Sequence, residues 1–278
     1  GATDKEQFYL SSDFKTYTLM SYLMRVNYSY DSRYYLTLTG RFDGSSKFSK
    51  NNKWGFFPSI AASWNLTQEA FMQDQHIIDN LRLRIGYGMA GNQNIPHYSY
   101  YTQYSPNTSL GSSILVNDGT YGNPDLKWEK QKQFNAGLDV TVWNNRLSFS
   151  LDYFHIINED LLMEISKYAS SGYLKEISNV GAMKNQGVEF ALNITPVQTK
   201  DFTWDLSFNI ASDRNKITRL DGLAREIYKL GGYSNNEIQR EGNLFVGESV
   251  NNIYVYKFDR IIQESDMDYV NSLDLGDR

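Results

Sequence analysis

The side chains that most often perform catalysis are few in this sequence and stand apart from one another. The three histidines, His76, His97 and His155, show neither the His-x-x-x-His nor the His-Glu spacing of a metal site. There is no cysteine, so neither a disulfide framework nor a thiolate metal site is expected. Two serine–glycine segments, Gly44–Ser46 and Ser170–Gly172, lack the nucleophile-elbow pattern. The sequence therefore predicts no catalytic residue, no metal ligand and no cofactor, and we expect the chain not to be an enzyme.

Two acidic pairs could imitate the carboxylates of acid–base catalysis. They are Glu159 with Asp160, and Asp266 with Asp268. Solvated loop charges explain both pairs more simply, and we predict that role for them.

Aromatic residues are the other side chains that could bind a ligand. A tyrosine-rich stretch runs from His97 to Tyr104 (HYSYYTQY). Its rings could stack on sugar faces or pack against peptide side chains, or the stretch could simply contact neighbouring loops. For any single tyrosine we favour the second interpretation, and we expect Trp128 to be structural or interfacial. The sequence assigns no substrate-binding residue.

Apolar and polar residues alternate along most of the chain. Hydrophobic residues make up 41% of its 278 residues and aromatic residues 15%, yet mean hydropathy is −0.52, so the two kinds must be finely interleaved. Such interleaving suits strands, whose successive side chains point to opposite faces. Eight runs are clear: 22–30, 34–42, 56–66, 81–89, 134–142, 147–153, 188–194 and 202–210. A ninth, weaker run lies at 253–260.

Two observations favour a membrane barrel over a soluble β-sandwich. The polar face carries full charges, which must be wet or paired across a lumen: Arg82, Arg84, Asp139, Glu189 and Asp205. The apolar face is rich in aromatics near the strand ends, as an interfacial girdle would be: Tyr30, Tyr34, Trp64, Tyr87, Trp143 and Trp204. No apolar run reaches about 18 residues, so no transmembrane helix is predicted. With a net charge of −5 and no basic face, nucleic acid is not an expected partner.

The connections alternate between short and long, as in an antiparallel meander with turns at one end and loops at the other. Short connections are predicted at 31–32, 144–145 and 196–201, and long ones at 91–129, 158–184 and 214–251. The segment 43–53 falls on the long side by parity, and 67–80 on the short side with a small helical turn around Glu69 to Ile78. We expect the long-loop end to carry the binding surface.

Five ordered stretches resemble the SusC/RagA family of TonB-dependent outer-membrane transporters from Bacteroidetes. They are 34–48 (YYLTLTGRFDGSSKF), 52–64 (NKWGFFPSIAASW), 81–93 (LRLRIGYGMAGNQ), 122–129 (GNPDLKWE) and 179–189 (NVGAMKNQGVE). The residues approaching Asp274 and Asp277 resemble the start of a family loop but do not complete it, so no calcium site is claimed.

The resemblance implies an all-β, antiparallel up-and-down transmembrane barrel, with about nine strands here of some 22. Residues 1–278 would then be a partial barrel domain, with the plug, the early strands and the final strands outside it. It further implies the outer membrane of a Gram-negative bacterium, contact with membrane lipid, a SusD-like surface lipoprotein as partner, TonB coupling through the missing N-terminal region, and oligosaccharide or oligopeptide cargo.

Within such a barrel, Arg82, Arg84, Asp139 and Glu189 would face the lumen, where they would either shape the channel or pair with the plug. A rival function is a soluble or surface carbohydrate-binding, adhesive β-protein. Heat-modifiable, detergent-dependent migration of the intact gene product separates the two, since only a barrel shows it.

Overall fold

The computed structural model describes residues 14–107, 114–117, 119–167, 169–220, 226–227, 244–250 and 252. All of these except Asn252 belong to one compact unit, 1–227 with 244–250; the second unit, 228–243 with 251–278, is otherwise outside the described residues. No helix in the described part of the chain is long and apolar enough to cross a membrane.

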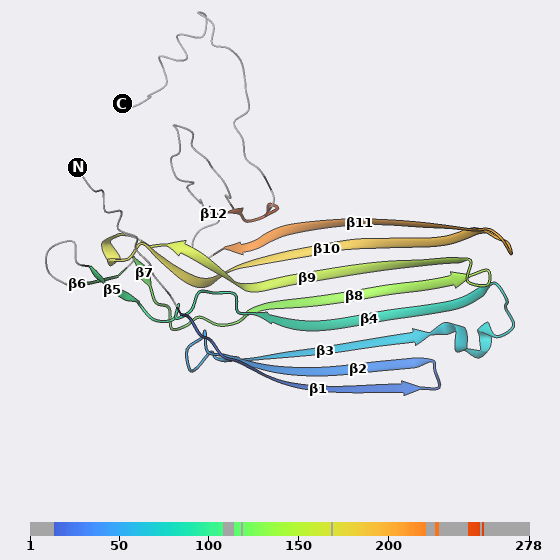
Figure 1. The fold of residues 1–278 in the computed structure, drawn as a ribbon, viewed down its shortest axis with the longest axis horizontal. Coiled ribbons are helices and arrows are strands. Elements are labelled where there is room, and N and C mark those ends of the chain that lie inside the picture. Colours follow the sequence, from blue (N-terminus) through green and yellow to red (C-terminus); the bar gives the residue numbers. More distant parts are fainter. Residues whose placement is uncertain are drawn as a thin grey trace, which may run out of the picture. The chain divides into compact units, whose positions relative to one another are not determined.

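Eight long antiparallel strands follow one another across a single sheet in chain order, which confirms the predicted meander (Figure 1). The sheet order is β1-β2-β3-β4-β8-β9-β10-β11. The strands are β1 (Leu19–Tyr30), β2 (Tyr34–Ser45), β3 (Trp54–Asn65), β4 (Ile78–Asn92), β8 (Glu129–Val142), β9 (Leu147–Ser166), β10 (Lys175–Gln198) and β11 (Thr203–Leu220). The ninth predicted strand, 253–260, lies outside the described residues.

Smaller elements occupy the connections. β5 (Tyr104–Asn107) pairs with β6 (Ile114–Asn117), and β12 (Glu226–Ile227) pairs with β13 (Leu244–Phe245). β7 (Thr120–Tyr121) adds a short parallel pairing to β10. Three single-turn helices complete the set: η1 (Leu66–Gln68), η2 (Ala70–Met72) and η3 (Ala169–Ser171).

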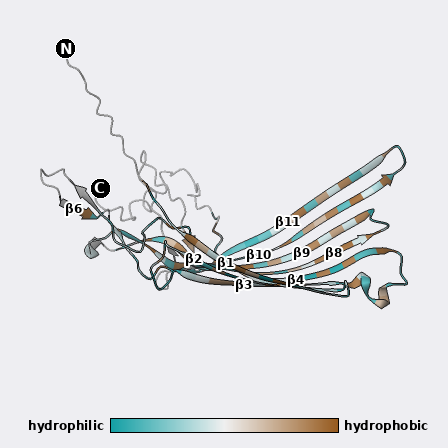
Figure 2. Cartoon of the chain, turned by 60° about the horizontal axis from the view of Figure 1, so that its bottom comes forward, coloured by the Kyte–Doolittle hydropathy of each residue, from teal (hydrophilic) through white to brown (hydrophobic). Residues whose placement is uncertain are grey.

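Hydrophobic and hydrophilic residues alternate along the strands (Figure 2). The pairing register aligns this alternation between neighbouring strands, so that the sheet has one apolar and one polar face. One row of directly paired residues is apolar across all eight strands: Tyr30, Tyr34, Trp64, Leu83, Leu138, Leu151, Phe190 and Ile210. The adjacent row, on the other face, is mostly small or polar: Ser29, Tyr35, Ser63, Arg84, Gly137, Asp152, Glu189 and Ala211. A slip of one residue would exchange the two faces, so this pattern fixes the register.

The prediction of a long loop at 158–184 was wrong. β9 continues to Ser166 and β10 starts at Lys175, leaving only a short connection between two of the longest strands. The pairing is interrupted by register shifts on either side of Gly181, and Asp160 takes a left-handed conformation with φ 57°. A bulge inserts an unpaired residue and breaks the period of two while the ladder goes on, which is why the alternation ends before the strands do. The loop predicted from Arg214 likewise begins late, because β11 extends to Leu220.

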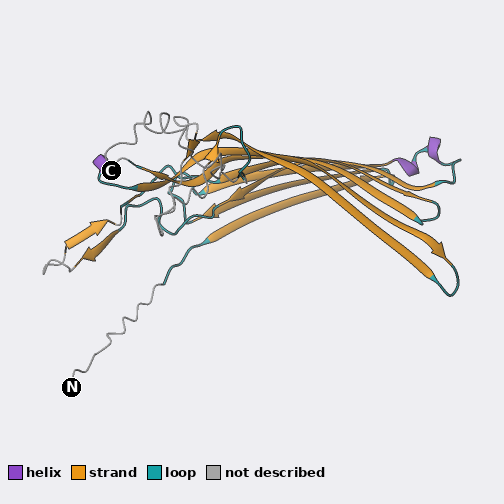
Figure 3. Ribbon diagram, turned by 90° about the horizontal axis from the view of Figure 1, so that it is seen from above, coloured by secondary structure: helices purple, strands orange, loops and turns teal. Residues whose placement is uncertain are grey.

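The short connections gather at the strand ends opposite the long ones, and η1 and η2 lie with them (Figure 3). Two of these turns, at Asp31–Ser32 and Asn144–Asn145, use consecutive residues with φ between 50° and 64°. Such left-handed pairs match the twist of the flanking strands, and Asn and Asp tolerate the conformation well.

The longest connection at this end, 66–77, is held to the sheet by the carboxylate of Glu69. Its Oε1 accepts hydrogen bonds from the Tyr34 hydroxyl at 2.7 Å and from Trp64 Nε1 at 2.9 Å, while Arg33 Nη1 lies 3.3 Å from Oε2. The hydrogen bonds from Tyr34 and Trp64, aided by the charge of Arg33, lower the pKa of Glu69 below its usual value. The predicted helical turn near Glu69 is thus confirmed, although Ile78 already belongs to β4.

We expect acid to release this connection. A depressed pKa in the folded state means that the contribution of Glu69 is present above the ordinary value of 4.5 and is lost as the pH falls through the lower folded value. Hydrogen exchange of the amides of residues 66–73, corrected for intrinsic pH dependence, should therefore accelerate on acidification. Glu69→Gln should remove most of that pH dependence. Equal pH dependence in the two proteins would contradict the assignment.

Candidate functional site

A charge cluster lies at the centre of the polar face, where three strands meet. Arg84 on β4 binds Asp139 on β8 through Nε at 2.7 Å and Nη2 at 2.9 Å. The same Nη2 reaches Asp152 Oδ1 on β9 at 2.9 Å. Gly137 lies beneath, and a Cβ there would come within 2.4 Å of Asp152 Oδ1 and 2.7 Å of Arg84 Nη2. The missing side chain therefore provides the room in which the arginine spans two strands.

The other charges predicted for the polar face are brought to it as well. Arg82 is the cross-strand partner of Asp139, and Glu189 stands directly opposite Asp152. Asp205 accepts a hydrogen bond from the Thr195 hydroxyl at 2.6 Å. One arginine thus bridges two carboxylates, while Glu189 has no ion-pair partner in the described part of the chain. The prediction that these residues share one face of the sheet is confirmed.

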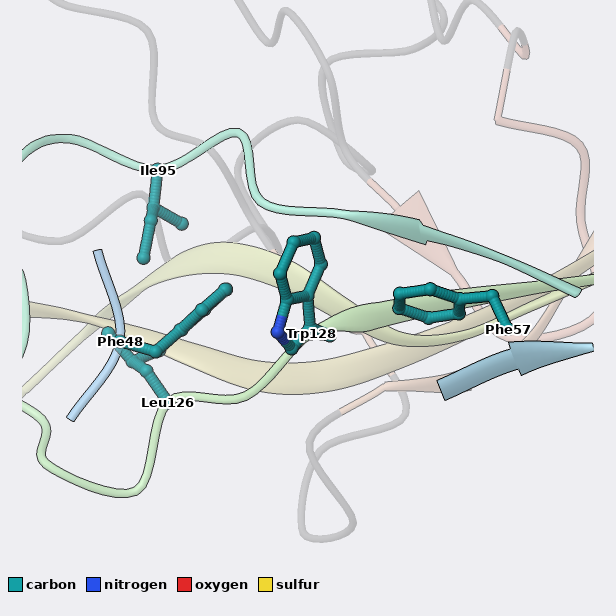
Figure 4. Close-up of a cluster of buried hydrophobic side chains, with 5 residues drawn as sticks. All are labelled: Phe48, Phe57, Ile95, Leu126 and Trp128. Carbon is teal, nitrogen blue, oxygen red and sulfur yellow. The ribbon is translucent and has the colours of Figure 1, made fainter. Parts of the chain in front are cut away.

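A buried hydrophobic cluster, drawn in Figure 4, lies at the opposite ends of the strands from the tight turns. Its side chains are at most 4% exposed: Phe48, Phe57, Ile95, Leu126 and Trp128. The Trp128 ring lies 5.3 Å from that of Phe48 and 5.5 Å from that of Phe57, and its Nε1 donates to the carbonyl of Lys53 at 3.0 Å. The expectation that Trp128 is structural is therefore confirmed.

This cluster forms where β3 and β4 cease to pair. Their last paired residues are Ser59 and Gly88, yet β3 extends to Trp54 and β4 to Asn92. Beyond that pair, Phe57 of β3 lies against Gly91 of β4, where a Cβ would stand 2.1 Å from its Cζ. Side-chain packing thus replaces the hydrogen-bonded ladder between these two strands.

The connection 93–128 is tied to its surroundings on both sides of the cluster. Towards the β2–β3 connection, Lys47 Nζ donates to the Ile95 carbonyl at 2.9 Å and Ser49 Oγ to the Pro124 carbonyl at 2.6 Å. Towards β10, the Asn179 side chain accepts from the Lys127 amide at 3.0 Å and donates to its carbonyl at 2.9 Å. These bonds fasten the two ends of the connection, near Ile95 and near Pro124 to Lys127, to the wall.

Beside the cluster, the tyrosine-rich stretch contributes to a hollow of about 200 Å³, which we call the Tyr17 pocket. The Lys47 ammonium lies 4.9 Å from the centre of the Tyr17 ring, and the His97 ring packs edge-on against Tyr17 at 5.4 Å. Its walls combine hydroxyls, aromatic rings and one cation, from Thr16, Tyr17, Thr18, Ser46, Lys47, His97, Tyr98 and Tyr100. Tyr101, by contrast, is 63% exposed and lies outside the lining.

The remaining residues of chemical interest are scattered. His76 lies in the 66–77 connection, His97 in the Tyr17 pocket and His155 on the apolar face of β9. Glu159 and Asp160 were predicted to lie in a loop, and that prediction was wrong, because β9 extends through both residues. They are paired instead: Glu159 with Lys132 at 2.6 Å, and Asp160 with Lys127 at 3.1 Å and Arg219 at 3.6 Å. Asp266, Asp268, Asp274 and Asp277 lie outside the described residues.

Comparison with known proteins decides the family. The model of the TonB dependent receptor-like β-barrel family matches residues 2–271. The chain belongs to this family. It is 38% identical over 255 residues to the TonB-dependent receptor SusC of Bacteroides thetaiotaomicron, covering 86% of this chain and 25% of that protein. It is also 38% identical over 250 residues to the TonB-dependent receptor P3 of Formosa agariphila, covering 88% and 25%.

Among solved structures, the chain matches one of the RagAB peptide importer in its closed-closed state. The TM-score is 0.74 at 33% identity, over 83% of this chain and 25% of that one. The chain thus spans about a quarter of the length of the relatives it matches.

Family membership assigns the two faces of the sheet. The chain is part of an outer-membrane β-barrel, so its apolar face meets lipid and its polar face lines the interior. The relatives are receptors and transporters, in agreement with the expectation that the chain is not an enzyme.

The structure also explains what the family stretches have in common. All five contribute to the buried cluster or its ties: 34–48 with Phe48, 52–64 with Phe57, 81–93 with Met89 and Gly91, 122–129 with Leu126 and Trp128, and 179–189 with Asn179. Sequence reasoning missed the cluster itself, although these aromatic and asparagine residues were its signal. The Tyr17 pocket had no such signal, since Thr16 to Thr18 precede the first alternating run.

We expect Gly91→Ala to destabilise the barrel, because the new Cβ would collide with the buried ring of Phe57. Overpacking of this kind costs roughly 1–3 kcal/mol. The measurement is the temperature at which the full-length protein loses the faster gel migration of its folded form. Gly86→Ala is the matched control, since its Cβ would meet nothing closer than 3.7 Å. Equal transitions for the two variants would mean that the cluster does not hold β3 and β4 together.

Proposed function

We propose that the full-length protein imports oligosaccharides or oligopeptides across the outer membrane. In this proposal the described strands are one sector of a closed barrel of about 22 strands. A plug domain fills the barrel, TonB supplies the energy through the N-terminal region, and a SusD-like lipoprotein covers the external opening. Support comes from the similarity to SusC and to a chain of the RagAB peptide importer.

The observation that carries the proposal is the folded state of the external end of the wall. Long external loops are common to outer-membrane barrels, but here the described parts of the 93–128 connection also contribute to a buried cluster and form hydrogen bonds to two neighbouring elements. Side chains on such a scaffold are held in place before a ligand arrives, which reduces the ordering cost of binding. The arrangement suits selection of cargo at the opening.

The Tyr17 pocket is the best candidate for cargo contact in the described residues. Its size suits one sugar ring or one amino-acid side chain rather than a whole oligomer. Aromatic rings offer rigid faces for either, and the hydroxyls and Lys47 offer polar contacts. We therefore assign it as one subsite of a longer path.

The rival function, a soluble carbohydrate-binding or adhesive protein, does not suit the sheet. Residues of its apolar face remain exposed from one side of the sheet to the other, for example Met24 on β1 at 71%, Phe56 on β3 at 59% and Phe208 on β11 at 55%. Exposed apolar surface this extensive needs lipid or another cover.

Import is tested by deleting the gene and measuring growth and uptake on panels of oligosaccharides and oligopeptides as sole nutrient. We expect loss of growth on at least one polymer class, restored by the full-length gene. Unchanged growth on every member of both panels would contradict import.

The pocket is tested separately. The oligomer whose use as a nutrient depends on the gene is titrated onto the purified full-length protein, and its affinity is measured. Tyr17→Ala with Tyr98→Ala should weaken binding by roughly tenfold or more, since each removes an aromatic contact. Tyr104→Ala should leave it unchanged, because that ring is 55% exposed and does not line the pocket. Equal affinities for both variants would remove the pocket from the cargo path while leaving import standing.

A further inference from the structure

Three basic side chains gather on the lipid-facing side of β10 and β11, at the external edge of the apolar band. Lys184 on β10 is directly paired with Lys216 on β11, and two residues along, Gln186 is paired with Arg214. Directly paired side chains stand about 5 Å apart at Cβ, so the three charges share one small area. We call Lys184, Lys216 and Arg214 the basic cluster.

The basic cluster adjoins the apolar surface without a gap. On the same face of β10, Lys184 is followed by Gln186, Val188 and Phe190, and Val188 is 45% exposed. On β11, Lys216 and Arg214 are followed by Ser212 and then Ile210, which is 58% exposed. The charges therefore lie at the height where acyl chains give way to headgroups.

No acidic side chain of the described residues forms an ion pair with this cluster, although Glu248 lies beside it in the chain segment next to β11, where its carbonyl accepts from the Ile217 amide at 2.9 Å. Glu159, the carboxylate on the same face one strand away, is bound to Lys132 at 2.6 Å. Asp160 is bound to Lys127 and Arg219. Asp213 and Glu189 neighbour the cluster in sequence or space but belong to the polar face, because Asp213 pairs with Gly187 and Glu189 with Ala211.

Like charges directly opposite each other destabilise an antiparallel pair. The Lys184–Lys216 pair carries that cost, and Arg214 adds a third positive charge beside it. An anion outside the protein would relieve the repulsion. Lysine and arginine stems can lie along apolar surface while their charged ends reach the headgroup level, and phosphate suits both ammonium and guanidinium groups.

We propose that the basic cluster binds the phosphate of an anionic glycolipid in the outer leaflet of the membrane. Lys184 and Lys216 grip the phosphate from two adjacent strands, and Arg214 approaches it from the apolar side. The acyl chains of the same lipid lie along Val188, Phe190 and Ile210. The site would fasten a lipid to the wall between β10 and β11.

The test uses the full-length protein purified in a mild detergent and lipid A as the probe, detected by native mass spectrometry. Lys184→Gln, Lys216→Gln and Arg214→Gln are combined in one variant. Removal of each charge should weaken binding roughly fivefold, so the triple variant should lose retained lipid A almost completely. Lipid A stripped of its phosphates should bind the unaltered protein no better than it binds the variant.

The matched control removes three lysines at the ends of the strands, Lys50, Lys53 and Lys200, each replaced by Gln. It should retain lipid A like the unaltered protein, and heat-modifiable migration shows that all the proteins are folded. Equal retention by the triple variant and the control would overturn the proposal, as would equal binding of phosphorylated and dephosphorylated lipid. If the triple variant kept lipid A but lost a co-purifying surface protein, the cluster would be a protein interface instead.

Discussion

In hydrocarbon, no water is present to satisfy backbone N–H and C=O groups, so a membrane wall made of strands must pair all of them internally. That requirement underlies the sheet described here. Each of the eight long strands is hydrogen-bonded to its neighbour in the order of the chain, and the register places most of the apolar side chains on the lipid-facing side. The charges needed for a water-filled interior then fall on the other face, where Arg84 gathers Asp139 and Asp152 above the gap left by Gly137. Lipid on one side thus determines the chemistry available on the other.

The same requirement relaxes at the external end, and the structure changes character there. β3 and β4 separate after Ser59 and Gly88, and side chains brought from three segments fill the space between them. Trp128 is central to this packing, because it touches both Phe48 and Phe57 and bonds the backbone at Lys53. The connection held in this way presents the Tyr17 pocket, while the outward side of β10 and β11 presents the basic cluster. Cargo and lipid would therefore meet different faces of one wall.

The sequence was sufficient to predict the long strands, their order and their two faces, because a period of two is visible in single residues. It failed where that period breaks although pairing continues. The bulges near Gly181 and Asp160 hid about half of β9 and β10, and the 158–184 segment was taken for a loop. The buried cluster could be located only in part. Phe48, Phe57 and Trp128 come from separate segments of the chain, and no local sequence pattern indicates that their side chains are in contact. The Tyr17 pocket and the Lys184–Lys216 pairing depend on tertiary contacts and register, which alternation alone does not give.

The most direct test of the central claim is a cysteine scan along β9, for which the absence of cysteine from these 278 residues is an advantage. Single cysteines at positions 148 to 153 of the full-length protein, with any cysteines elsewhere replaced, are treated in intact membranes with a water-soluble maleimide and with a lipid-soluble one. We expect strict alternation: cysteines in place of Phe149, Leu151 and Tyr153 react with the lipid-soluble reagent, whereas cysteines in place of Ser148, Ser150 and Asp152 react with the water-soluble one. Labelling of all six positions by the water-soluble reagent, or labelling without alternation, would contradict a membrane-spanning strand with one lipid face and one interior face.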